Sequence, residues 1–158
     1  MFITILISVG AIGLGVAIGL KKAKKEKELY NKGIIMRRDI NYAEKGEEFT
    51  SKVGDLQRVK ESLSSLNAGC EFKGSVQEVV FKGKPFAATL SLVSFDEATG
   101  TAVYRFNFTH FRESGYSYEN GTGMNMLLTA VEKMFLSLDP DTSVKTFDVG
   151  FKKKRSVF

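Results

Sequence analysis

An apolar stretch runs from Phe2 to Leu20 and stops at a block of lysines. Its 19 residues include no ionisable side chain, and only Thr4 and Ser8 are polar. As a helix that rises 1.5 Å per residue, the stretch is about 28 Å long, close to the roughly 30 Å of a bilayer's hydrocarbon core. A buried core helix would have polar residues along one side instead. The sequence therefore predicts a single transmembrane helix over residues 1–20.

The charges beside this stretch predict its orientation. No basic residue precedes it, whereas a dense lysine cluster follows it, so the positive-inside rule places the rest of the chain in the cytoplasm. The expected location is thus the cell membrane, with a single span. The alternative is secretion after signal cleavage, because Ala17-Ile18-Gly19 supplies small residues. A signal peptide, however, has a basic start and a shorter apolar stretch.

Small residues recur along one face of the predicted span. Ala11, Gly15 and Gly19 lie four apart, and such a face lets two membrane helices approach closely. We therefore expect these three residues to form a helix-helix contact if the protein self-associates. Glycine is also common in membrane helices generally, which is the simpler interpretation.

The positive charge of the chain is concentrated at two places. Residues 21–38 hold eight basic and two acidic residues, and the tail, residues 152–158, holds four basic ones. Because the total is only +5, the stretch between them is net negative, which disfavours binding to nucleic acid. An anionic inner leaflet is the expected partner of the basic residues. The predicted membrane-contact residues are Lys21, Lys22, Lys24, Lys25, Arg37, Arg38, Lys152, Lys153, Lys154 and Arg155.

Residues 21–46 form a basic juxtamembrane connector. Its first part is rich in Lys, Glu and Ala, which favour a helix, and Asn31-Lys32-Gly33 is a stop signal. The segment Ile34–Tyr42 is ambiguous between a short strand and an interfacial stretch.

Residues 47–151 are expected to form one small cytoplasmic domain. Apolar residues spaced three or four apart predict an amphipathic helix over residues 48–66. Alternating patterns bounded by turn residues then predict strands over 75–82, 86–95 and 101–112, joined as an antiparallel meander.

A second apolar helix is predicted over residues 124–138, ended by Asp139-Pro140, and a last strand over 144–151. The resulting order is α-β-β-β-α-β. It predicts an α+β fold in which two helices pack on one face of a three- to four-stranded antiparallel sheet.

The chain contains one His and one Cys, 40 positions apart, so neither a metal site nor another cofactor is expected. No nucleophile motif accompanies His110, and catalytic residues are not predicted. The alternation of strand 101–112 places His110 on the side of the phenylalanines, where a partly buried histidine is expected.

The best ligand-site hypothesis lies between His110 and Gly123. Basic and aromatic side chains converge there beside a glycine-containing loop at a helix start, an arrangement that favours an anionic ligand. The loop lacks the lysine of a phosphate-binding loop, so an ordinary surface loop is the simpler interpretation. The residues of this site are His110, Arg112, Glu113, Tyr116, Tyr118 and Thr122.

These patterns favour a membrane-anchored binding or scaffold domain over an enzyme. The expected partners are the membrane, a protein and a second copy of the chain. The alternative function is a small-ligand sensor or enzyme that uses residues 110–123.

Overall fold

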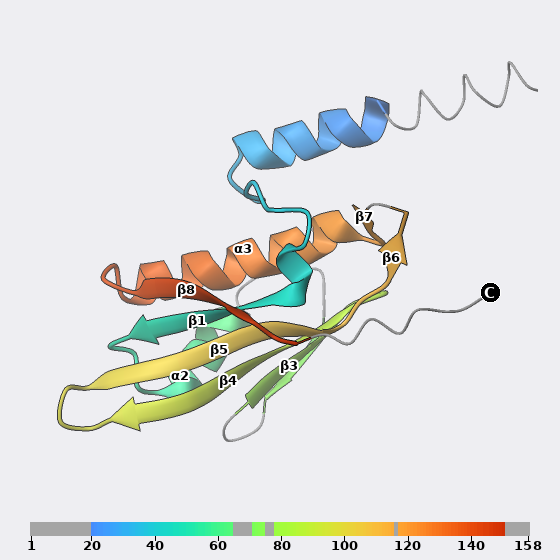
Figure 1. Ribbon diagram of the computed structural model, residues 1–158. Coiled ribbons are helices and arrows are strands. Elements are labelled where there is room, and N and C mark those ends of the chain that lie inside the picture. The colour runs from blue at the N-terminus through green and yellow to red at the C-terminus, as the bar shows by residue number, and fades with distance from the viewer. Residues whose placement is uncertain (1–19, 65–70, 75–77, 116, 151–158) are drawn as a thin grey trace, which may run out of the picture. The chain divides into compact units, whose positions relative to one another are not determined.

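The computed structural model describes residues 20–64, 71–74, 78–115 and 117–150 (Figure 1). The chain divides into two compact units, Met1–Arg37 and Arg38–Phe158. In the first unit, residues 20–31 are helical. The backbone N–H of Ile34 donates to the carbonyl of Leu29, and Gly33 has a φ of +65°, the left-handed conformation that ends many helices. The predicted stop at Gly33 is therefore confirmed.

No helix among the described residues is both long enough and apolar enough to cross a bilayer. The stretch predicted to span, Phe2–Leu20, lies outside the described residues except for Leu20. The predicted helix-helix contact at Ala11, Gly15 and Gly19 and the basic tail also lie outside them.

The second unit is a small α+β domain with an antiparallel sheet, as the sequence predicts, but the sheet has six strands in the order β2-β3-β4-β5-β1-β8. A separate two-stranded sheet pairs β6 with β7. The strands are β1 (Lys45–Ser51), β2 (Glu71–Gly74), β3 (Glu78–Lys82), β4 (Ala87–Asp96), β5 (Thr101–His110), β6 (Glu113–Ser114), β7 (Ser117–Tyr118) and β8 (Ser143–Asp148). The helices are η1 (Tyr42–Glu44), a 3₁₀ turn, α2 (Leu56–Ser64) and α3 (Gly121–Leu138).

The meander of β3, β4 and β5 is confirmed, since each strand pairs antiparallel with the next. Two register shifts interrupt the long β4–β5 ladder. At one of them Ala88 lies opposite Phe108 but Ala87 lies opposite His110, so Thr109 is an extra residue. This bulge reverses the alternation of β5 beyond Phe108.

The predicted helix over residues 48–66 is wrong at its start. Residues Lys45–Ser51 form β1, which lies between β5 and β8, and only Leu56–Ser64 is helical. Phe49 is fully buried, but it faces the core from a strand rather than from a helix. The carboxylate of Asp55 accepts a hydrogen bond from the backbone N–H of Gln57 at 2.8 Å and so caps the true helix start.

The ambiguous segment Ile34–Tyr42 contains no strand; it ends in η1, which begins at Tyr42. The predicted last strand is confirmed as β8, although it is shorter than expected, and it pairs with β1 at the edge of the sheet. Because β1 precedes α2, the predicted order α-β-β-β-α-β is replaced by one in which a strand precedes the first helix of the domain.

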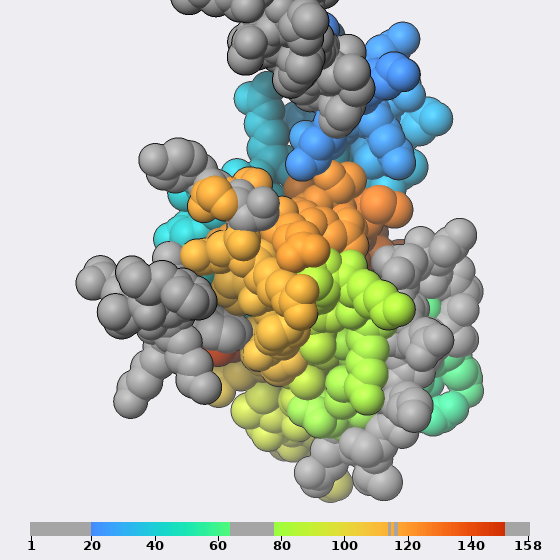
Figure 2. Space-filling view, turned by 90° about the vertical axis from the view of Figure 1, so that its right-hand side faces the viewer, coloured from blue at the N-terminus to red at the C-terminus, as the bar shows by residue number. Residues whose placement is uncertain are grey.

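Helix α3 begins three residues before its predicted start. Asn120 is the cap residue, with a φ of 57°, and its side-chain oxygen accepts from the backbone N–H of Gly123. Its side-chain nitrogen donates to the carbonyl of Lys84 at 3.0 Å, which attaches the helix start to the β3–β4 loop. Figure 2 shows this start (orange) beside the β3 region (light green).

Helices α2 and α3 pack on one side of the sheet. In Figure 1, β8 passes in front of α3, and β4 and β5 pass in front of α2. The buried side chains of the two helices and of alternate strand residues form one hydrophobic cluster. Near its centre the rings of Phe49 and Phe135 are stacked with centroids 4.6 Å apart, and Tyr104 lies 5.0 Å from Phe135.

On the sheet face opposite the helices, residues of β8, β1 and β5 contact one another across the strands. The ring of Phe147 in β8 lies where a Cβ atom on Gly46 would be, with its nearest atom at 2.2 Å. The guanidinium of Arg105 lies 5.2 Å from the centre of that ring, and it also pairs with Glu48 at 2.8 Å. Because Gly46 has no side chain, the ring of Phe147 packs directly against the backbone of β1.

We expect Gly46→Ala to lower the free energy of unfolding by about 1–2 kcal/mol, because the new methyl group displaces the Phe147 ring. Urea unfolding measures this change. Gly121→Ala is the matched control, since its Cβ would meet only Tyr118 Cβ at 3.6 Å, an ordinary contact. Equal stability of the two variants would contradict the packing of Phe147 on Gly46.

Candidate functional site

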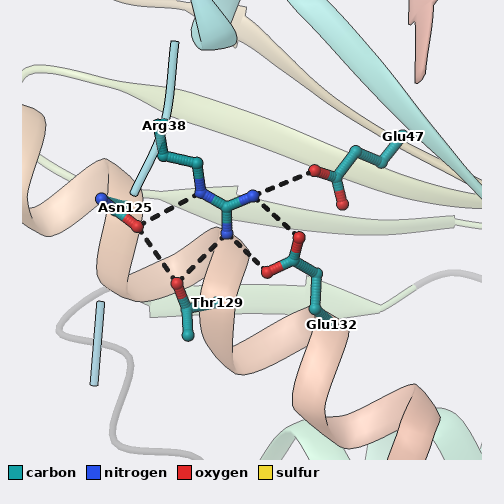
Figure 3. Close-up of polar contacts among 5 residues, drawn as sticks. All are labelled: Arg38, Glu47, Asn125, Thr129 and Glu132. Carbon is teal, nitrogen blue, oxygen red and sulfur yellow. Dashed lines mark hydrogen bonds and ion pairs between the residues drawn. The ribbon is translucent and has the colours of Figure 1, made fainter. Parts of the chain in front are cut away.

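The most elaborate polar arrangement in the described residues surrounds the guanidinium of Arg38. Its two terminal nitrogens donate to both carboxylate oxygens of Glu132, one at 2.7 Å, and Nη1 also donates to Glu47 at 3.2 Å. Nε donates to the Asn125 side-chain oxygen at 3.3 Å, and Nη2 to the Thr129 hydroxyl at 3.2 Å. We call these five residues the Arg38 cluster (Figure 3).

Three separate segments form the Arg38 cluster. Arg38 begins the second unit, Glu47 is in β1, and the remaining residues are on α3. Asn125, Thr129 and Glu132 are spaced four and three apart, so they share one face of the helix. The hydroxyl of Thr129 also donates to Asn125 at 3.1 Å, which orients the amide toward Arg38. Each polar neighbour on α3 therefore faces the guanidinium.

The Arg38 cluster is largely shielded from solvent and unbalanced in charge. Side-chain exposure is 11% for Arg38, 10% for Glu47 and 13% for Glu132. One guanidinium therefore faces two carboxylates. Glu47 Oε2 is buried and has no hydrogen-bond partner within the described part of the chain.

These surroundings shift two pKa values. Burial raises the pKa of Glu47 to about 8; the negative charge of Glu132 acts in the same direction, and Arg38 opposes it. Burial alone would lower the pKa of Arg38, but the hydrogen bond and charge of Glu132 outweigh it, so this pKa is raised. Arg38 thus stays charged while Glu47 favours its neutral form.

Sequence patterns did not reveal the Arg38 cluster. Arg38 was expected to contact the membrane, but its guanidinium is bound to Glu132 and Glu47. The available signal was the polar stripe of Asn125, Thr129 and Glu132 among the apolar residues of the helix. Nothing in the sequence places that stripe opposite Arg38, which lies 94 residues before Glu132.

An aromatic group lies beside the chain segment that follows Arg38. Tyr42 makes edge contacts with Tyr118 and Phe108, with ring centroids 5.4 and 6.2 Å apart. Its hydroxyl donates to the carbonyl of Gly121 at 2.9 Å. Burial, followed by the charge of Tyr118, raises the pKa of Tyr42, so its hydroxyl remains a donor. The segment 38–44 is thus attached at both Arg38 and Tyr42.

A pocket of about 380 Å³ lies between this segment and the β6–β7 hairpin. It is lined by Ile40, Asn41, Glu44, Glu113, Gly115, Ser117 and Tyr118. Two members of the predicted ligand site, Glu113 and Tyr118, are thus brought together. The lining has two glutamates and no basic residue among the described positions, which favours a cationic ligand over the anion expected from the sequence.

The other members of the predicted site lie elsewhere. His110 is exposed, not partly buried, because the bulge at Thr109 turns it to the face opposite Phe108. The side chain of Arg112 is exposed, while its carbonyl accepts from the backbone N–H of Glu119 at 2.8 Å. Thr122 is in the first turn of α3. Tyr116 lies outside the described residues.

The remaining membrane-contact residues fall in the first unit or outside the described range. Lys21, Lys22, Lys24 and Lys25 are exposed on the helix of residues 20–31. Arg37 is exposed, and its guanidinium lies 5.5 Å from the centre of the Tyr30 ring. Lys152, Lys153, Lys154 and Arg155 lie beyond the described positions.

What the geometry of the Arg38 cluster shows is the attachment of segment 38–44 to β1 and α3. In the described ranges, no three His, Cys, Asp or Glu residues are grouped so as to hold a metal ion. No family model matches the chain, and no curated protein or solved structure matches it significantly. The function therefore has to be inferred from the residues themselves.

We expect Arg38→Ala to lower the free energy of unfolding by about 3 kcal/mol or more, because it leaves the carboxylate of Glu132 buried without a countercharge and removes the donor to Glu47. Arg38→Lys should lose less, since it keeps the charge but not the planar fork of donors. Chemical denaturation of the two variants measures both effects. Arg37→Ala is the control and should change stability by less than about 0.5 kcal/mol. If Arg37→Ala lowered the stability as much as Arg38→Ala, the assignment of the buried ion pairs to Arg38 would be contradicted.

Proposed function

We propose that the chain is a binding or scaffold protein anchored in the cell membrane, with its α+β domain on the cytoplasmic side. The apolar stretch of residues 2–20 and the lysines that follow it support the span and its orientation. The small residues of that stretch support self-association. The expected partners are the anionic leaflet, a protein and a second copy of this chain.

The observation that carries this proposal is the attachment of Arg38. Arg38, the first residue of the second unit, is bound to β1 and α3 by the Arg38 cluster, and Tyr42 attaches the chain again four residues later. The first residues of the α+β domain are therefore held against β1 and α3. A domain whose start is held in this way suits a scaffold, because its surfaces keep their shape.

The edge strand β8 is the surface that we assign to a protein partner. It ends the strand order of the sheet, and five of its six residues are exposed. An edge strand offers backbone donors and acceptors to an added strand, and side chains on alternate positions then provide specificity. Lys145 and Asp148 add charges of both signs to this edge.

We expect a fluorescent protein fused after Phe158 to be active in a bacterial host and a secreted phosphatase fused there to be inactive. The fusion should remain with the membranes after carbonate extraction, because residues 2–20 span the bilayer. Replacing Lys21, Lys22, Lys24 and Lys25 by Gln should weaken this orientation. An active phosphatase would overturn the cytoplasmic placement, and a soluble secreted product would support cleavage.

The second candidate function is a small-ligand sensor, which the pocket between residues 40–44 and the β6–β7 hairpin favours. Its carboxylates, the amide of Asn41 and the apolar side chain of Ile40 suit a small organic cation. This candidate is compatible with the membrane anchor, since the pocket lies wholly within the second unit.

We expect propylammonium to shift the amide NMR signals of Asn41, Gly115 and Ser117, and inorganic phosphate to leave them unchanged. Glu44→Gln combined with Glu113→Gln should weaken propylammonium binding at least tenfold, because it removes both carboxylates from the lining. Glu48→Gln, on the sheet face that bears Arg105, is the control. Shifts produced by phosphate alone would restore the original expectation of an anionic ligand.

A further inference from the structure

The Arg38 cluster contains one guanidinium and two carboxyl groups, so it is neutral only if one carboxyl is protonated. Glu132 takes both terminal nitrogens of the guanidinium, whereas Glu47 receives a single hydrogen bond from Nη1. Its second oxygen, Oε2, is buried without a hydrogen-bond partner in the described structure. An ionised carboxylate in this position would be both desolvated and close to a like charge.

Among the described residues, only Arg38 and Glu132 place a charge beside Glu47. From the connector the facing charge is Arg38, and from α3 it is Glu132, beside the neutral Asn125 and Thr129. Its strand partners are Phe106 in β5 and Thr146 in β8, and neither is charged. Further along β1, Lys45 pairs with Asp39 at 4.0 Å.

We propose that the Arg38 cluster is a proton-dependent attachment. One proton on the Glu47 carboxyl keeps the cluster neutral and holds segment 38–44 against β1 and α3; loss of that proton releases the segment. The ionisation breaks the O–H bond of the Glu47 carboxyl and transfers its proton to water, and no other covalent bond changes. This inference does not depend on the membrane anchor, because every group involved lies in the second unit.

The direction of the pH effect follows from the pKa of Glu47. In the folded protein, burial and Glu132 raise this pKa to about 8, whereas a glutamate in an unfolded chain titrates near 4.3. The contribution to attachment is therefore fully present below about pH 4.3, decreases as the pH rises, and is lost above about pH 8. Between those limits each pH unit changes the equilibrium between attached and released states by about tenfold.

The attachment also adjoins the pocket. Ile40, Asn41 and Glu44 line the pocket and belong to the segment that Arg38 holds at its start. Release of the segment would therefore displace one wall of the pocket. The protonation of Glu47 thus controls whether segment 38–44 stays in place as a wall of the pocket.

The test compares amide hydrogen-exchange protection of residues 39–44 at pH 6 and pH 9, corrected for intrinsic exchange. In the full-length protein, protection should fall about 100-fold, since roughly two pH units separate pH 6 from the pKa of Glu47. Glu47→Gln, which resembles the neutral carboxyl, should show no such fall. Glu48→Gln is the matched control: this neighbour lies on the opposite sheet face, pairs with Arg105, and should behave like the parent.

A second measurement keeps the proposal testable if Glu47→Gln does not fold. The ¹³C chemical shift of the Glu47 carboxyl in the parent protein should titrate near pH 8, and Glu132→Gln should move that midpoint lower. Titration of Glu47 near pH 4 would overturn the proposal. An equal fall of protection in the parent and in Glu47→Gln would overturn it as well.

Discussion

The arrangement of this domain depends on the burial of one guanidinium. A desolvated positive charge is stable only where hydrogen-bond acceptors and a countercharge surround it. Arg38 finds them on β1 and on one face of α3, where Glu132 provides a two-point contact. Because these partners come from segments far apart in the chain, the same interaction that satisfies Arg38 also joins segment 38–44, the sheet and α3.

The position of β1 in the sheet brings Glu47 close to Arg38. β1 lies between β5 and β8, so strands from both ends of the domain meet at one place in the sheet. Phe49 of β1 stacks on Phe135 of α3, and Glu47 of the same strand reaches Arg38. Asp139, at the end of α3, accepts hydrogen bonds from the Ser51 hydroxyl and the Lys52 backbone N–H. Apolar and polar contacts thus fix α3 against the same strand along its length.

The sequence predicted correctly the elements that are specified by nearby residues, and it failed where distant contacts decide the structure. The β3–β5 meander and helix α3 were predicted because short turns and their own apolar periodicity specify them. The first strand was mistaken for helix because Phe49, Val53 and Leu56 fit a helical spacing, and all three are buried in the strand, loop and helix that form instead. The predicted ligand site was divided because one inserted residue, Thr109, turns His110 away, which strand alternation does not reveal.

By itself the sequence determined the apolar stretch of spanning length, the separation of basic ends from an acidic middle, the α+β class and the antiparallel meander. These features depend on composition or on neighbours a few residues apart, so local periodicity and charge reveal them. Only the tertiary structure decided that β1 is a strand, that β8 is an edge, and that Arg38 binds Glu47 and Glu132. Strand pairing and the burial of charge need partners that lie tens of residues away, and no local pattern names them.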